Sequence, residues 1–133
     1  MPARSAKARV NGHLSSVRNV DELQRLAKLN LTLSYVHMAH GVKPAYLVGP
    51  SRGSRKLSQA RQTFQYLSHI CFGLSYSELA SFAHRDRTSV AHACKVVEDR
   101  RDATQIDRAL HFAEFALHEA YQADWGETHD PGQ

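Results

Sequence analysis

The chain has 133 residues, of which 42% are hydrophobic and 23% charged, and this composition indicates a single globular domain with its own core. No apolar run approaches the roughly 20 residues that a membrane-spanning helix needs, and no apolar segment follows the basic N-terminus as in a secretory signal. Cys71 and Cys94 each fall on the apolar side of a predicted helix and lack the paired spacing of metal ligands. We therefore expect reduced core thiols in a cytoplasmic protein, with no membrane contact, disulfide or bound metal.

The charges are unevenly distributed along the chain. The formal net charge is +4, and residues 1–97 hold fourteen Lys and Arg against four Asp and Glu, whereas residues 98–133 hold three against nine. No acidic residue lies between Leu23 and Ser77. This asymmetry favours a polyanionic partner on one side of the molecule, although a basic surface that only aids solubility has the same composition.

Both ends of the chain differ in composition from the middle. Residues 1–18 lack apolar periodicity and are predicted to form a flexible basic arm, which either touches phosphates or is a simple tail. Residues 125–133 are rich in glycine and polar residues and are predicted to be a disordered tail. A single helical domain is expected over residues 19–124.

The domain begins with a helix predicted over 20–40, and Gly41 is a natural residue to end it. Its apolar residues recur every three or four positions: Leu26, Leu29, Leu33 and Val36. A short helical turn is predicted over 42–48, with Pro44 near its start.

A polar, basic loop is predicted over residues 51–56, and its cations are Arg52, Arg55 and Lys56. The loop lacks the residue order of a nucleotide-binding phosphate loop. Its composition fits a segment that follows a nucleic-acid backbone or enters a minor groove, or else a solvated linker.

A second long helix is predicted over 58–72, with Phe64, Leu67 and Cys71 on its buried side. Two further helices, joined by a tight turn, are predicted after it. Ser75 and Glu78 form a capping box at the start of the next, short helix. That helix is predicted to bury Tyr76, Leu79, Ala80 and Ala83. A turn at residues 84–85 then leads to a helix that runs to about residue 100, and this order is typical of a helix-turn-helix.

The helix that follows the turn has two different faces, and Asp86 is its predicted N-cap. One face is apolar: Val90, Ala93, Cys94 and Val97. The opposite face is polar and carries Thr88, Ser89, His92 and Lys95. Arg85 and Arg87 lie just before the first turn. Hydroxyls and imidazole can reach base edges and cations can reach phosphates, so this face suits a DNA groove. The alternative is an amphipathic surface helix with a solvated face.

A last helix is predicted over 105–123, with Asp102 or Thr104 as its cap. Its apolar stripe consists of Ile106, Leu110, Ala113, Leu117 and Tyr121. Its outer face carries Asp107, Glu114 and Glu119, which DNA would repel, so we place this helix away from DNA as a brace. The fold class is therefore all-α, a compact helical domain. No catalytic constellation or cofactor motif accompanies it, so we expect neither an enzyme nor a cofactor.

Three groups of residues resemble a known family: Ala60-Arg61-Gln62, then Gly73-Leu74-Ser75 with Glu78-Leu79, then Arg85-Asp86-Arg87-Thr88-Ser89-Val90-Ala91-His92-Ala93. The family is the C-terminal DNA-binding domain of the bacterial replication initiator DnaA. Its signature runs R-D-H-T-[TS]-V-x-H-A, after an upstream A-R-Q or P-R-Q. The resemblance extends more weakly to the helices on either side.

The resemblance implies a compact helix-turn-helix domain that binds the short duplex repeats called DnaA boxes. In the major groove, it implies base contacts by Asp86, Arg87, Thr88, Ser89 and His92. On the backbone or in the minor groove, it implies contacts by Arg52, Arg55, Lys56, Arg61, Gln62, Arg85 and Lys95. Either Arg52 or Arg55 would be the minor-groove arginine.

The chain departs from the family pattern in three places. Arg87 replaces the family's histidine, which can shift the preferred box, and the segment between Glu78 and Phe82 is one residue shorter than usual. Ala83 and His84 stand where the family prefers glycines. The initiator's ATPase module has no counterpart in this sequence, which is expected to be a stand-alone version of the DNA-reading domain.

Two classes of function follow. The leading hypothesis is a nucleoid-associated, monomeric regulator of replication initiation or transcription that binds double-stranded DNA at DnaA-box-like sites. The alternative is an interaction protein, a decoy or adaptor for the initiator or its regulators, with weak or no DNA binding. A weaker third reading is a transcription factor with unrelated operators.

Overall fold

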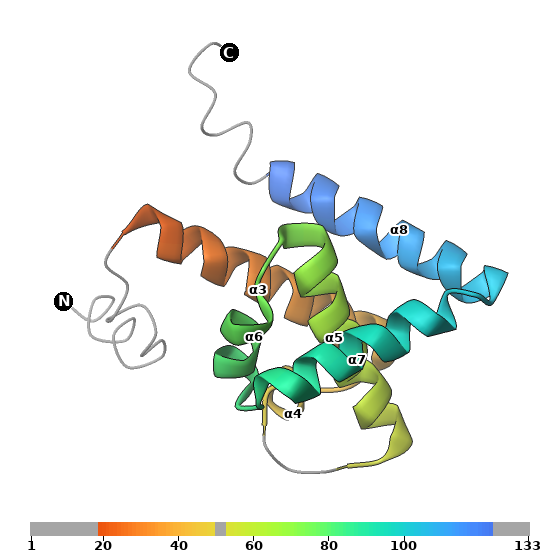
Figure 1. Cartoon of the computed structure of the whole chain (residues 1–133). Helices are drawn as coiled ribbons and strands as arrows, with labels where there is room; N and C mark the ends of the chain where they lie inside the picture. The colour runs from red at the N-terminus through yellow and green to blue at the C-terminus, as the bar shows by residue number, and fades with distance from the viewer. Residues whose placement is uncertain (1–18, 50–52, 124–133) are drawn as a thin grey trace.

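The computed structural model describes residues 19–49 and 53–123, which form an all-α domain without strands in those ranges (Figure 1). The elements are α3 (Val20–His40), α4 (Pro44–Leu47), α5 (Arg55–Phe72), α6 (Tyr76–Ala83), α7 (Arg87–Arg100) and α8 (Thr104–Tyr121). The all-α fold with a helix-turn-helix and a closing helix is thus confirmed. The predicted arm over 1–18, Arg52 in the basic loop, and the predicted tail over 125–133 lie outside the described residues. No helix in the described ranges is long and apolar enough to cross a membrane.

The central helix is α5, which packs mainly against α7 on one side and α3 on the other, while α8 lies across α3 and α5 (Figure 1). Its residues Ala60, Phe64 and Leu67 are completely buried in one continuous core. Burying a large apolar side chain contributes about 1.5–3 kcal/mol relative to leaving it exposed, so this helix organises the fold. The other helices are positioned by the apolar faces that they turn toward it.

The ends of the helices mostly follow the local sequence signals. Gly41 and Gly73 adopt left-handed backbone conformations and close α3 and α5, as predicted. The capping box at the start of α6 is also confirmed, because the Ser75 hydroxyl accepts from the Glu78 amide at 3.0 Å and the Glu78 carboxylate accepts from the Ser75 amide at 2.9 Å.

Two predicted boundaries are wrong. Helix α5 begins at Arg55, inside the predicted loop, because the Ser54 hydroxyl accepts a hydrogen bond from the Leu57 amide at 3.2 Å and caps an earlier turn. At the start of α8, neither Asp102 nor Thr104 is the cap. The N-cap residue is Ala103, whose side chain offers no acceptor.

Some predicted burial is also wrong. The α8 stripe is confirmed at Leu110, Ala113 and Leu117, but Ile106 is 39% exposed at the open end of the helix. Tyr121 is only half-buried, as is Tyr76 on α6. Both tyrosines pack by their rings, with Phe72 and His69 respectively, rather than by full burial. Cys94 is buried, as predicted, but Cys71 is only half-buried. Both cysteines are free thiols, and burial raises the pKa of each to about 11.

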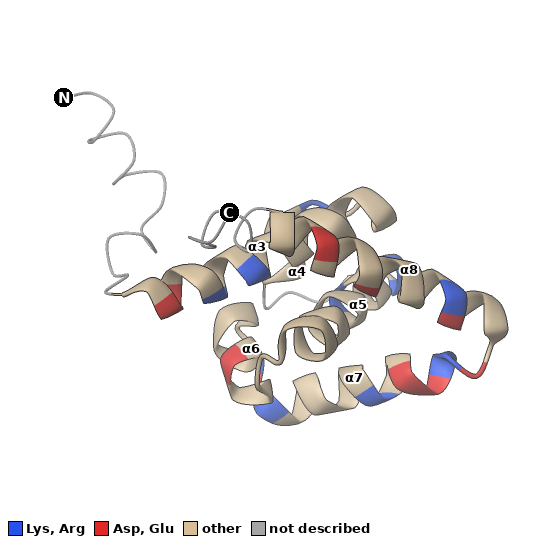
Figure 2. Ribbon diagram, turned by 90° about the horizontal axis from the view of Figure 1, so that it is seen from above, with Lys and Arg blue, Asp and Glu red and all other residues tan. Residues whose placement is uncertain are grey.

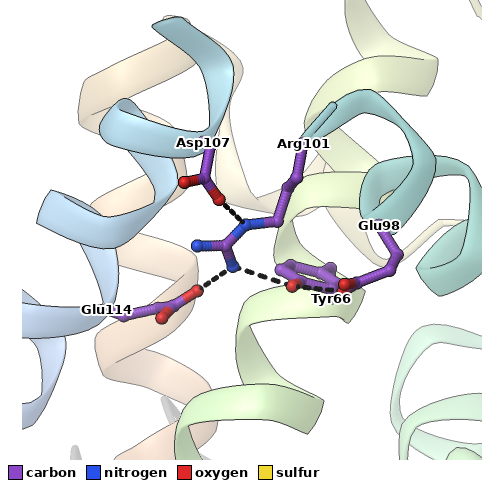
Figure 3. Close-up of polar contacts among 5 residues, drawn as sticks. All are labelled: Tyr66, Glu98, Arg101, Asp107 and Glu114. Atoms are coloured by element: carbon purple, nitrogen blue, oxygen red, sulfur yellow. Dashed lines mark hydrogen bonds and ion pairs between the residues drawn. The ribbon is translucent and has the colours of Figure 1, made fainter. Parts of the chain in front are cut away.

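The prediction that Glu114 lies on the outer face of α8 is wrong. Its carboxylate turns toward Arg101, which follows α7 (Figure 3). The Arg101 guanidinium also donates to the Asp107 carboxylate at 2.6 Å and to the Tyr66 hydroxyl at 2.9 Å, and that hydroxyl donates to Glu98 at 2.7 Å. Burial and the bond to Glu98 raise the pKa of Tyr66 to about 12. This network ties α5, α7 and α8 together at one end of the domain.

The turn between α6 and α7 contains a strained residue. His84 has φ +55°, in the left-handed region, and its amide donates to the Ala80 carbonyl to end α6. A side chain with a Cβ atom pays a steric penalty in this conformation, which glycine does not. The turn geometry therefore imposes a cost at the position where the related domain prefers glycine.

His84→Gly is expected to stabilise the protein by about 0.5–1 kcal/mol, because glycine relieves the strain at positive φ. Urea denaturation followed by circular dichroism measures the change. The control is Ser81→Gly, an exposed position inside α6, which should destabilise by about 0.5–1 kcal/mol because glycine is unfavourable within a helix. An equal decrease in the free energy of unfolding in both variants would show that His84 is not strained in this turn.

Arg101→Met is expected to destabilise the protein by about 2–3 kcal/mol, because it leaves Glu114 and the Tyr66 hydroxyl partly buried without their cationic partner. Its control is Arg108→Met on the exposed side of α8, which should change stability by about 0.5 kcal/mol or less. A similar free energy of unfolding in both variants contradicts a structural role for the network.

Candidate nucleic-acid interface

The exposed face of α7 presents the predicted base-reading residues together. The apolar residues Val90, Ala93, Cys94 and Val97 are all buried, as predicted. Their burial turns the polar side of the helix outward, and the residues exposed there are Arg87, Thr88, Ser89, His92 and Lys95. An α-helix fits the roughly 12 Å width of a DNA major groove, so these side chains can face base edges together.

Asp86 caps α7, as predicted, since its carboxylate accepts a hydrogen bond from the Ser89 amide at 2.7 Å. The bond to the Ser89 backbone holds the pKa of the Asp86 carboxyl below its usual range. The side chain is therefore ionised at neutral pH and can only accept hydrogen bonds. Because it remains exposed, it can also accept from a base donor such as the amino group of cytosine.

A hollow of about 270 Å³ lies beside this face, where the first half of α5 meets the start of α7. It brings together five residues that the sequence predicted as DNA contacts: Arg61, Gln62, Arg85, Ser89 and His92. Guanidinium, amide, hydroxyl and imidazole groups converge there. Such a set of donors suits a phosphate group that lies beside the major groove.

The two arginines of the hollow are held in place by backbone carbonyls. Arg61 is only 6% exposed, and its Nε donates to the Tyr46 carbonyl at 2.8 Å. An Arg85 nitrogen lies 3.4 Å from the Gly49 carbonyl oxygen. Burial and the nearby charge of Arg85 lower the pKa of Arg61, which indicates two cations close together. An anion between them relieves that repulsion.

The predicted backbone cations outside the hollow lie on different parts of the surface. Arg55 is exposed in the first turn of α5, and Lys95 lies 3.7 Å from Asp99 one turn along α7. Such exposed ion pairs contribute little, so Lys95 remains available to a phosphate. Lys56 lies near the end of α3. The pKa of His40 is lowered there, first by the burial of His40 itself and then by the charge of Lys56. The structure therefore places Lys56 outside the hollow.

Four further residues line the hollow and were not predicted as DNA contacts: Gly53, Ser58, Gln65 and Ala93. Ser58 and Gln65 precede and follow Arg61 by three and four residues, which places them on one face of α5. That spacing was present in the sequence and could have identified them. Gly53 carried no such signal, because its position depends on how the loop enters α5.

The charges agree with an interface on the α7 side. Figure 2 shows basic positions along the first part of α7 and acidic positions only toward its end, where they approach α8. Within the described residues, no group of His, Cys, Asp or Glu side chains is arranged to hold a metal ion. The interface thus consists of exposed helix residues beside a polar, cationic hollow.

These features define a helix-turn-helix DNA-binding domain. The family model described as the bacterial DnaA protein helix-turn-helix matches residues 31–97, and the chain belongs to this family. No curated protein and no solved structure was found to match the chain. The matched residues run from the middle of α3 to Val97, the last buried residue of α7, and include every residue that lines the hollow. The protein is thus a DnaA-like, DNA-binding protein.

Asp86→Ala and Asp86→Asn separate the capping role of this carboxylate from its charge. Alanine removes the acceptor and is expected to lower the urea midpoint, whereas asparagine is an equally good N-cap and should preserve the midpoint at pH 7. The wild-type carboxylate has a lowered pKa, so its stabilising effect is present above its unfolded pKa and is lost as the pH falls through the folded value. Asp86→Asn should lose this part of the acid sensitivity, as measured by urea titrations between pH 2 and pH 7.

Proposed function

We propose that this protein binds double-stranded DNA sequence-specifically at sites that resemble DnaA boxes. It regulates replication initiation or transcription by occupying sites that the initiator also uses. Helix α7 enters the major groove, and the hollow between α5 and α7 receives a backbone phosphate. The proposal is supported most directly by the convergence of Arg61, Gln62, Arg85, Ser89 and His92 on that one hollow.

The residues divide into two roles on this proposal. Asp86, Arg87, Thr88, Ser89 and His92 carry the sequence preference, because they lie in the first turns of the exposed face and reach base edges. The two arginines and Gln62 of the hollow, together with the outlying cations, hold the backbone and set the register. The predicted backbone residues are Arg52, Arg55, Lys56, Arg61, Gln62, Arg85 and Lys95, and either Arg52 or Arg55 enters the minor groove.

Arg87 is the residue most able to change the preferred sequence. It lies exposed at the first position of α7, where the resemblance places a histidine. An arginine can donate two parallel hydrogen bonds to a guanine, which a histidine does not do. The proposal therefore includes a box variant with a guanine opposite Arg87, rather than the initiator's own preferred sequence.

The protein is expected to bind a duplex with a DnaA box at least tenfold more tightly than a scrambled duplex of the same composition, measured by fluorescence anisotropy. His92→Ala and Thr88→Ala should cost about 1–3 kcal/mol on the box and relax its discrimination. Arg55→Ala and Lys95→Ala should instead weaken binding to both duplexes and reduce the salt dependence.

A panel of boxes with single base changes, tested with the wild-type chain and with Arg87→His, locates the base that residue 87 reads. The preference should move at one position only. Equal affinity for box and scrambled duplexes in the wild-type chain contradicts sequence-specific binding.

A further inference from the structure

Helix α8 has a second apolar face that the fold leaves uncovered. Leu110, Ala113 and Leu117 pack into the core, whereas Phe112 is 68% exposed and Phe115 is 62% exposed. At 100° per residue, both phenylalanines point away from the core stripe. Large apolar side chains that lie together on a surface mark an interaction site more often than isolated ones do.

The neighbouring helix extends this patch. Ile70 of α5 is 47% exposed, and it lines a shallow hollow of about 300 Å³ together with Phe115. Cys71, His111, Glu114 and His118 line the rest of this hollow, so Ile70 and Phe115 meet on the outer side of the domain with polar side chains beside them. We refer to Phe112, Phe115 and Ile70 as the α8 patch.

Two opposite charges flank the α8 patch along the helix. Arg108 lies one turn before Phe112, and Glu119 lies one turn after Phe115. Both are exposed, and neither has an ion pair or hydrogen bond to another part of the chain that the structure describes. The positions 108, 112, 115 and 119 are separated by four, three and four residues, which is the spacing of a helix–helix seam.

This arrangement is complementary to itself. When two copies of α8 pair in antiparallel orientation about a point between residues 113 and 114, Phe112 lies opposite Phe115, and Arg108 lies opposite Glu119, at both ends. A two-fold symmetric interface requires this property, in which residue i meets j and j meets i. We propose that the partner of the α8 patch is a second copy of this chain.

The proposed dimer does not use the DNA-binding side. Figure 2 shows α7 along one edge of the domain and α8 on the other side of α5. Pairing through the outward side of α8 leaves the exposed face of α7 and the hollow beside α5 free in both copies. The contact is one helix pair, which is smaller than a standard interface, so we expect weak and reversible association.

Sedimentation equilibrium of the full chain without DNA tests the pairing, at concentrations from about 10 to 500 µM. A reversible monomer–dimer equilibrium is expected. Phe112→Gln should abolish dimers over this range. Met38→Gln is the matched control, because Met38 is 80% exposed on α3, and this variant should dimerise like the wild type.

Charge reversal tests the antiparallel register. Arg108→Glu alone and Glu119→Arg alone each place like charges at both ends of the pair, so each should weaken self-association at least fivefold. An equimolar mixture of the two variants restores both opposite-charge pairs, and heterodimers should form at wild-type affinity.

Three results would overturn the proposal. The first is a chain that stays monomeric at every concentration tested. The second is a dimer that persists in Phe112→Gln. The third is a mixture of charge variants that associates no better than either variant alone. Each can be read without DNA, so failure here leaves the proposed DNA binding standing.

Discussion

The packing of α5 against α7 is the constraint on which the rest of the structure depends. The buried faces of these helices meet in the core, and the four apolar residues of α7 determine which side of that helix remains outside. The same contact brings Arg61 and Gln62 beside Ser89 and His92. A rotation of α7 by one residue would bury Ser89 or His92 and expose Val90, so the core sets the orientation of the recognition surface.

Several residues serve the fold and the interface at once. Arg61 is buried and bonded to the Tyr46 carbonyl, yet it lines the hollow that faces α7. Asp86 starts α7 and also lies among the proposed base-reading residues. At such positions a loss of DNA binding cannot by itself be attributed to a lost contact. Isosteric or equally capping replacements are more informative than alanine there.

Local chemistry made much of this molecule predictable. The capping box at Ser75, the glycines at the ends of α3 and α5, and the apolar stripe of α7 each depend on residues a few positions apart. The side of α7 that faces outward follows from that stripe alone. Of the five hollow residues expected to touch DNA, Arg61 and Gln62 came from the resemblance to the DnaA domain. Arg85, Ser89 and His92 were already identified on or just before the polar face of the predicted helix, and the fold then brought all five together.

Two errors about side-chain position arose because the neighbours of a helix face come from distant parts of the chain. Glu114 has the spacing of an outer-face residue of α8, but its position depends on Arg101, which sequence periodicity cannot place. Ile106 fits the apolar stripe, yet no helix covers the start of α8 fully enough to bury it. The strain at His84 could not be predicted from the sequence either, because the positive φ of this residue results from the turn that joins α6 to α7.

The acidic residues at the end of the domain position α8. Three of its carboxylates, those of Glu98, Asp107 and Glu114, belong to the network around Arg101 and Tyr66 and brace α8 against the body (Figure 3). This bracing holds α8 at a fixed angle and thereby fixes the direction in which Phe112 and Phe115 point. A rigid outward face is a requirement for symmetric pairing, because a mobile helix would lose the register between the two copies. The residues that repel DNA at this end therefore leave one surface for nucleic acid and a separate one for a second copy of the chain.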